Sequence, residues 1–158
     1  MGTAIKNIDL AVSKKERFTI NNDESRVIEL NLSDMNVLTR YSEILPKLNE
    51  AVDSYGAIDF NDDSEEAFVT YGKAFRELDN SIREAIDFIF DYPVSNVCSY
   101  GGSMFDLQDG SFRFEVIIET LFGMYDSKVD EESKKLQKKM KAHTDKYLPQ
   151  DRKRKSSK

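Results

Sequence analysis

The side chains in this chain that could carry out covalent or metal chemistry are few and isolated. The sequence contains one cysteine, Cys98, and one histidine, His143, and the two are far apart along the chain. A nucleophilic cysteine needs a base beside it, and a zinc site needs several Cys or His ligands at short spacing. Neither pattern is present. We therefore expect Cys98 to be a small packed residue and predict neither zinc binding nor histidine-based catalysis.

The acidic side chains suggest calcium only at one short segment. Asp59, Asn61 and Asp63 alternate as the first ligands of a calcium loop do, but the sixth loop position is Ser64 instead of Gly and the twelfth is Thr70 instead of Glu. The cluster is more typical of a capped helix start. No carboxylate pair is marked out for acid-base work, and neither glycine-rich phosphate motif occurs. We predict no enzyme activity, no cofactor and no metal.

Charge is divided unevenly along the 158 residues. The net charge is −6, but residues 1–127 carry 11 Lys and Arg against 24 Asp and Glu, whereas residues 128–158 carry 12 against 5. An acidic body thus precedes a basic tail that ends in DRKRKSSK. This tail could be a solvated segment that aids solubility, or Arg152, Lys153 and Arg154 could contact an acidic surface of another protein or of nucleic acid. Nucleic acid is a poor fit, because the acidic body would repel a duplex. The sequence has no long apolar run and no disulfide pair, so a soluble intracellular protein is expected.

The longest element predicted is an amphipathic helix over residues 63–92. Asp63 and Glu66 form a D-x-x-E start signal, and Pro93 forces the chain out of the helix. Its apolar residues recur at steps of three and four, which places them on one face: Phe68, Tyr71, Phe75, Leu78, Ile82, Ala85 and Ile89.

The remaining segments are predicted to lie against this helix. Residues 17–32 read as a β-hairpin with one apolar face and a loop of four or five residues around 21–25. A second helix should begin at Ser33 or Asp34 and end at Gly56, with a kink or a division into two helices near Pro46. A tight turn at Gly101-Gly102 should precede a third helix from Ser111 to about residue 125. A solvated, lysine-rich helix follows from about residue 128, either continuous with the third or hinged near residue 126.

These elements predict a mainly α fold, in which an N-terminal β-hairpin is followed by a bundle of three to four helices with a basic C-terminal helix and a disordered tail. The domain boundaries expected are an arm over 1–15, one helical domain over 16–127, and a basic extension over 128–158.

Aromatic residues supply the only candidate binding surface. They are concentrated in the helices over 63–92 and 111–125, and a core of this size need not hold all of them. The sequence leaves open whether they are all core or whether some line an exposed groove between these two helices. The candidate partner-binding residues are Phe68, Tyr71, Phe75, Phe114, Phe122 and Tyr125, together with the basic tail residues named above.

The order of segments resembles the tail assembly chaperone-like proteins of long-tailed phages of Gram-positive bacteria. The stretches that carry the resemblance are FTINNDESRVIELNLSDMNVLTRYSEIL, REAIDFIFDYPVSNVCSYGGSMFD and HTDKYLPQDRKRKSSK, within residues 16–158. The SYGGSMFDLQDGS loop and Pro46 depart from that layout. The resemblance brings no catalytic residues with it.

What the resemblance implies is a non-enzymatic chaperone in the cytoplasm of the infected bacterial host. It would bind the tape measure protein, keep this long helical protein soluble and help to recruit tail tube protein. The oligomeric state does not follow from the sequence. The alternative is a small acidic phage-encoded inhibitor of a host defence or host enzyme, which would present a contiguous acidic face that mimics nucleic acid.

Overall fold

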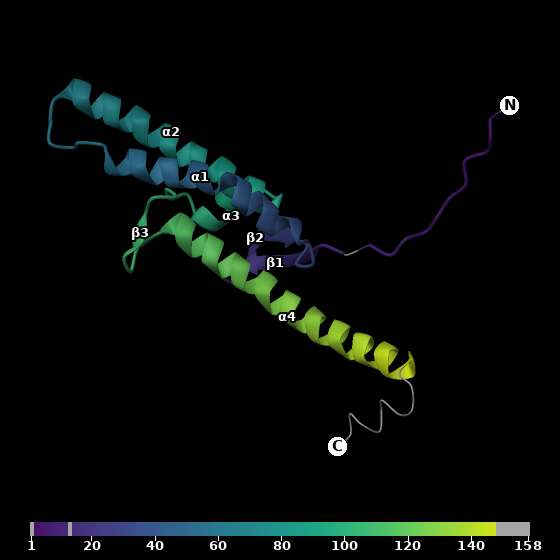
Figure 1. Cartoon of the computed structure of the whole chain (residues 1–158). Helices are drawn as coiled ribbons and strands as arrows, with labels where there is room; N and C mark the ends of the chain where they lie inside the picture. Colours follow the sequence, from purple (N-terminus) through teal and green to yellow (C-terminus); the bar gives the residue numbers. More distant parts are fainter. Residues whose placement is uncertain (1, 13, 148–158) are drawn as a thin grey trace, which may run out of the picture.

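The computed structural model describes residues 2–12 and 14–147 (Figure 1). It confirms the mainly helical fold with an N-terminal antiparallel hairpin. Among the described residues, no helix combines the length and the apolar composition that crossing a membrane requires. The elements in chain order are β1 Glu16–Ile20, β2 Asp23–Leu30, α1 Asn36–Gly56, α2 Glu65–Phe90, α3 Val94–Ser99, β3 Leu107–Gln108, β4 Ser111–Phe112 and α4 Arg113–Tyr147.

The hairpin of β1 and β2 has the predicted apolar face, but its turn is shorter than predicted. Phe18 lies opposite Ile28 in the antiparallel register, and Ile28 is fully buried. Asn21 and Asn22 alone make the turn, both with positive φ (52° and 59°). Asparagine tolerates this left-handed conformation, which matches the twist of the flanking strands, so Asp23 already belongs to β2.

Helices α1 and α2 lie side by side (Figure 1). α1 is a single helix that includes Pro46, so the predicted division into two helices is wrong. It begins at Asn36 with Met35 as its N-cap, so the predicted start at Ser33 or Asp34 is wrong by one or two residues. Asp34 still contributes, because its carboxylate accepts the Asn36 N–H at 3.0 Å. α2 starts after Ser64, not Asp63 as predicted, because the Ser64 hydroxyl accepts the Ala67 N–H.

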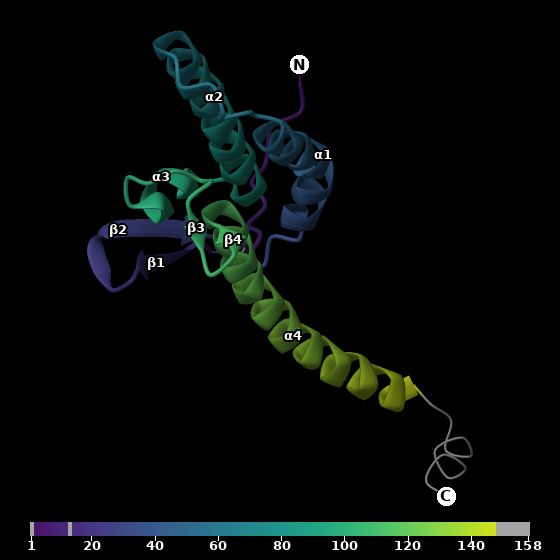
Figure 2. The same ribbon diagram turned by 90° about the vertical axis from the view of Figure 1, so that its left-hand side faces the viewer.

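The third predicted helix and the lysine-rich helix form one continuous element. α4 runs for 35 residues from Arg113 to Tyr147, without a break near residue 126. At 1.5 Å per residue it is about 50 Å long. Its first half packs in the core, whereas its second half projects beyond the other elements in both views (Figures 1 and 2). Four ion pairs at spacings of three or four residues support that second half.

The core lies where α1, the C-terminal half of α2, the hairpin and the first half of α4 meet. Its fully buried side chains include Ile28, Val37, Ile82, Ile86 and Met104. The N-terminal arm takes no part in it, because its apolar residues are all at least 80% exposed. The arm has no helix or strand in residues 2–12 and extends away from the body (Figure 1).

Candidate functional site

A groove runs between α1 and α4. A cleft of about 710 Å³ adjoins a second of about 450 Å³, and both are bounded by Tyr41, Ile118 and Glu119. We call the two together the α1–α4 groove. Its remaining lining residues are Leu38, Leu45, Leu48, Asn49, Val52 and Asp53 on α1, then Ser111 just before α4, and Phe114, Glu115, Phe122, Gly123 and Asp126 on α4.

Helical periodicity on the two facing helices builds the floor of the groove. On α1, apolar residues recur at steps of three and four from Leu38 to Val52, and on α4 they recur from Phe114 to Phe122. Tyr41 and Phe122 meet edge to face with ring centroids 5.1 Å apart, which joins the two helices across the floor. Leu38 is 53% exposed at one end of the groove, so the groove offers apolar surface to a partner.

The rim of the groove is acidic. Asp53 on α1 and Glu115, Glu119 and Asp126 on α4 line it, and their residues are exposed. None of these four carboxylates forms an ion pair within the part of the chain that the structure describes, and no Lys, Arg or His is among the described lining residues. An apolar floor with an uncompensated acidic rim is complementary to an amphipathic segment with basic flanks.

The aromatic residues predicted on the central helix lie away from this groove. Phe68 is 60% exposed, and Tyr71 and Phe75 are half-buried. Tyr71 contacts the rings of Phe60 and Phe68 near the free end of α2. Phe75 packs instead on Phe105, with ring centroids 5.8 Å apart. These residues do not form one surface with the predicted residues of α4.

The predicted residues of α4 divide between core and groove. Phe114 and Tyr125 are only 5% and 4% exposed, so Tyr125 belongs to the core and Phe114 reaches the groove only as part of its floor. Phe122 is half-buried and lines the groove, but opposite α1 instead of α2. The sequence therefore indicated a groove beside α4, and the structure places it against the other neighbour. The basic residues Arg152, Lys153 and Arg154 lie outside the described residues.

A loop that contains Met104 and Phe105 fills the space between α2 and α4. It belongs to the SYGGSMFDLQDGS stretch, which departs from the layout of the tail assembly chaperones. Phe105 stacks on Tyr55 of α1 at 4.7 Å and contacts Phe75 of α2 and Phe114 of α4. Met104 beside it is fully buried. These two side chains occupy the position of the groove that the sequence left open between α2 and α4.

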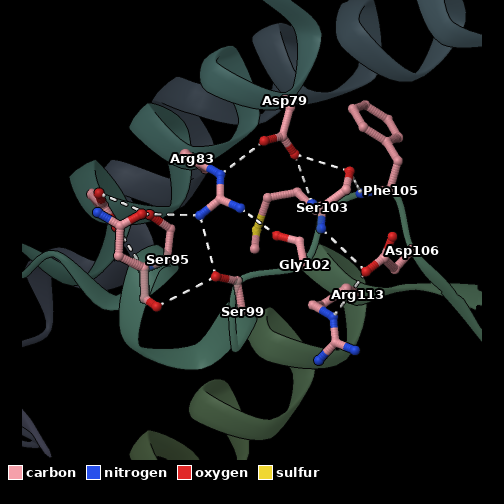
Figure 3. A network of polar contacts seen from close by, with 12 residues as sticks. Asp79, Arg83, Ser95, Ser99, Gly102, Ser103, Phe105, Asp106 and Arg113 are labelled. Carbon is pink, nitrogen blue, oxygen red and sulfur yellow. Dashed lines mark hydrogen bonds and ion pairs between the residues drawn. The ribbon is translucent and has the colours of Figure 1, made fainter. Parts of the chain in front are cut away.

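A polar network fixes this loop to α2 (Figure 3). Asp79 accepts hydrogen bonds from the Met104 N–H at 2.7 Å and the Ser103 hydroxyl at 3.1 Å. It also pairs with Arg83 at 2.9 Å, and the side chains of both residues are less than one fifth exposed. Arg83 in turn donates to the Gly102 carbonyl. Asp79 and Arg83 thus bind the polar groups of the loop as well as each other, which makes the network a structural brace.

The Cys98 thiol shows no sign of activation. Burial, with a smaller contribution from the charge of Asp87, raises the pKa of the Cys98 thiol to about 11. A thiol with such a pKa stays protonated at neutral pH and is a poor nucleophile. Within the described residues, no three Cys, His, Asp or Glu side chains are grouped so that they could hold a metal ion. Asp59 and Asp62 instead accept N–H groups two residues ahead, as turn residues do.

Comparisons of the chain with protein families, with curated protein sequences and with solved structures find no significant match.

Proposed function

We propose that this chain is a non-enzymatic chaperone of phage tail assembly that binds a helical segment of the tape measure protein in the α1–α4 groove. The observation that carries the proposal is the apolar floor of the groove with four carboxylates at its rim that have no ion-pair partner among the described residues. The segment bound would be an amphipathic helix whose apolar face enters the groove and whose flanks carry Lys or Arg. The tape measure protein and the tail tube protein come from the resemblance of the sequence to tail assembly chaperones.

The dimensions of the groove support a helix as the occupant. Each of its two clefts has the volume of an ordinary ligand pocket, which is about 300–1,000 Å³, and the two follow one another along the same pair of helices. A helix laid in such a groove places residues i, i+3 or i+4, and i+7 in successive hollows. Rim acids would then attract the basic flanks and speed the encounter.

The arrangement of acids favours this function over the inhibitor alternative. A nucleic-acid mimic needs carboxylates spaced as phosphates on a continuous polar face. Here the carboxylates flank an apolar floor, which a basic nucleic-acid cleft would not complement.

The first experiment is co-expression with the tape measure protein and the tail tube protein from the same genome, with tape measure solubility as the readout. Leu38→Asp places a charge on an exposed position of the groove, and Glu119→Lys reverses one rim charge. Both variants should fold and lose the soluble complex. Phe68→Asp is the matched control, because Phe68 is equally exposed but lies on α2, outside the groove.

Each outcome of that experiment has a definite meaning. If Phe68→Asp abolishes the complex and Leu38→Asp does not, the binding surface is the aromatic end of α2 and the groove is the wrong site. If wild-type chain forms no complex with either protein while remaining folded, the chaperone proposal is wrong, and a pull-down from host lysate tests the inhibitor alternative.

A further inference from the structure

The projecting half of α4 carries an apolar stripe with coiled-coil spacing. Val129, Ser133, Leu136 and Met140 follow one another at steps of four, three and four, which are alternating d and a positions of a heptad. Leu136 is 56% exposed and Met140 is 59% exposed. A helix that projects from its domain is only marginally stable in water by itself, so an exposed stripe at this spacing indicates a helical partner.

A hollow on this stripe has the composition of a coiled-coil hole. It measures about 310 Å³, and five residues line it from α4: Lys128, Val129, Glu132, Ser133 and Leu136. The last four stand at i, i+3, i+4 and i+7, which is the set of four that receives one knob from a facing helix. Leu32, Ser33 and Met35 from the segment before α1 close one side of the hollow. The hollow therefore fits one long apolar side chain.

We propose that α4 pairs antiparallel with α4 of a second copy of this chain, so that Leu136 of each copy enters the hollow of the other. In this register Met140 packs against Val129, and Ser133 packs against Leu136, which keeps every a position opposite a d position as antiparallel pairs require. The two Leu136 knobs and the two hollows are related by the two-fold axis, so the interface is closed.

The charges beside the stripe favour a second copy of α4 as the partner, and they favour the antiparallel direction. Asp130, Glu131 and Glu132 begin the segment, whereas residues 134–141 contain five lysines and no acid. In the antiparallel register Glu132 and Lys139 occupy g positions that face each other across the interface, twice per dimer. A parallel pair would instead place Glu132 beside Gln137 and lose both ion pairs. The substitutions that test the pairing all lie outside the α1–α4 groove, so failure of the pairing and failure of the proposed function can be told apart.

Sedimentation equilibrium of the full-length chain at high micromolar concentration should show a monomer–dimer equilibrium. Glu132→Lys places like charges opposite each other at both g–g contacts and should raise the dimer dissociation constant by about tenfold. Lys139→Glu should do the same. The double variant with both substitutions should restore the wild-type dissociation constant, because the two opposite-sign pairs form again in reversed order.

The matched control is the pair of substitutions Glu131→Lys and Lys138→Glu, at outward f positions of the same two turns. Glu131→Lys removes an intrahelical ion pair with Lys135, as Glu132→Lys also does, but the control should leave the dissociation constant unchanged, and circular dichroism should show equal helix content. A wild-type chain that stays monomeric, or a double variant that does not recover, overturns the proposal. Loss of the dimer on deleting residues 1–12 would also overturn the proposal, because the apolar arm, and not a second α4, would then cover the stripe.

Disulfide cross-linking between introduced cysteines shows directly whether the two α4 helices run antiparallel or parallel. In a Cys98→Ser background, a mixture of Val129→Cys and Met140→Cys chains should form the mixed disulfide, and Met140→Cys alone should not cross-link to itself. Self-cross-linking of Met140→Cys at the same rate would mean a parallel pair and would overturn the antiparallel register.

Discussion

Replacing Asp79 by alanine tests whether the loop over residues 100–106 is held by one side chain. Asp79 accepts the N–H of the buried Met104, accepts the Ser103 hydroxyl and pairs with Arg83. In the Asp79→Ala variant the Met104 N–H has no partner, and Arg83 keeps only its uncharged acceptors: Asn96, Ser99 and the Gly102 carbonyl. The loop should therefore loosen, together with the Phe105 ring that fills the space between α1, α2 and α4.

The magnitude follows from these contacts. A buried N–H left without an acceptor costs about 1–3 kcal/mol. Losing the partner of a buried ion pair costs about 3–5 kcal/mol; we take about half of that here, because Asp79 and Arg83 keep 16% and 19% side-chain exposure and Arg83 retains other acceptors. The better helix propensity of alanine returns about 0.5 kcal/mol. The expected net loss in the free energy of unfolding is about 3 kcal/mol.

Urea denaturation followed by circular dichroism measures this loss. Glu77→Ala on the same helix is the control, since Glu77 is exposed, and it should change the free energy of unfolding by less than about 0.5 kcal/mol. A double-mutant cycle with Arg83→Ala should give a coupling energy of at least about 1 kcal/mol. A loss below about 1 kcal/mol for Asp79→Ala would refute the reasoning, because an orphaned Met104 N–H alone should cost that much.

Two further predictions rest on single titratable groups. Because the pKa of Cys98 is raised to about 11, iodoacetamide at pH 8 should alkylate the native chain at least about tenfold more slowly than the urea-unfolded chain; equal rates would show that the thiol is not buried as described. Partial burial would raise the pKa of Asp34, but hydrogen bonds from the Arg40 guanidinium and the Asn36 N–H outweigh it and hold the pKa below its ordinary value. The folded pKa is thus below the unfolded one, so this stabilisation is present above about pH 4 and is lost as the pH falls through the folded pKa; urea titrations should show that Asp34→Asn destabilises the chain at pH 6 but has a vanishing effect near pH 2.

Much of the fold could be predicted because its signals are local. The periodicity of apolar residues located all the long helices and the apolar face of the hairpin, and Pro93 located the end of α2. Two local details were wrong for local reasons. Asn21 and Asn22 tolerate the left-handed backbone that shortens the hairpin turn, and Ser64, one residue after the predicted cap, has the hydroxyl that accepts the Ala67 N–H.

The candidate site could not be predicted in the same way. Periodicity shows which face of a helix is apolar but not how far its neighbour extends along that face. The stripe of α2 looks uniform from Phe68 to Ile89, yet only the residues from Ile82 onward are buried. The sequence also could not predict which segment packs against α4, because Phe105 is distant in sequence from the Tyr55 and Phe75 rings that it contacts.

By itself, then, the sequence determined the helical class, the division into an acidic body and a basic tail, and the lack of any residue pattern typical of catalysis. Only the tertiary structure decided that Phe114 and Tyr125 are core, that Phe68 is surface, and that the groove lies between α1 and α4. The physical reason is that burial of an apolar side chain depends on which segments meet it in space. Here the segment over 100–106, fixed by Asp79 and Arg83, fills one side of α4 and leaves the other side open.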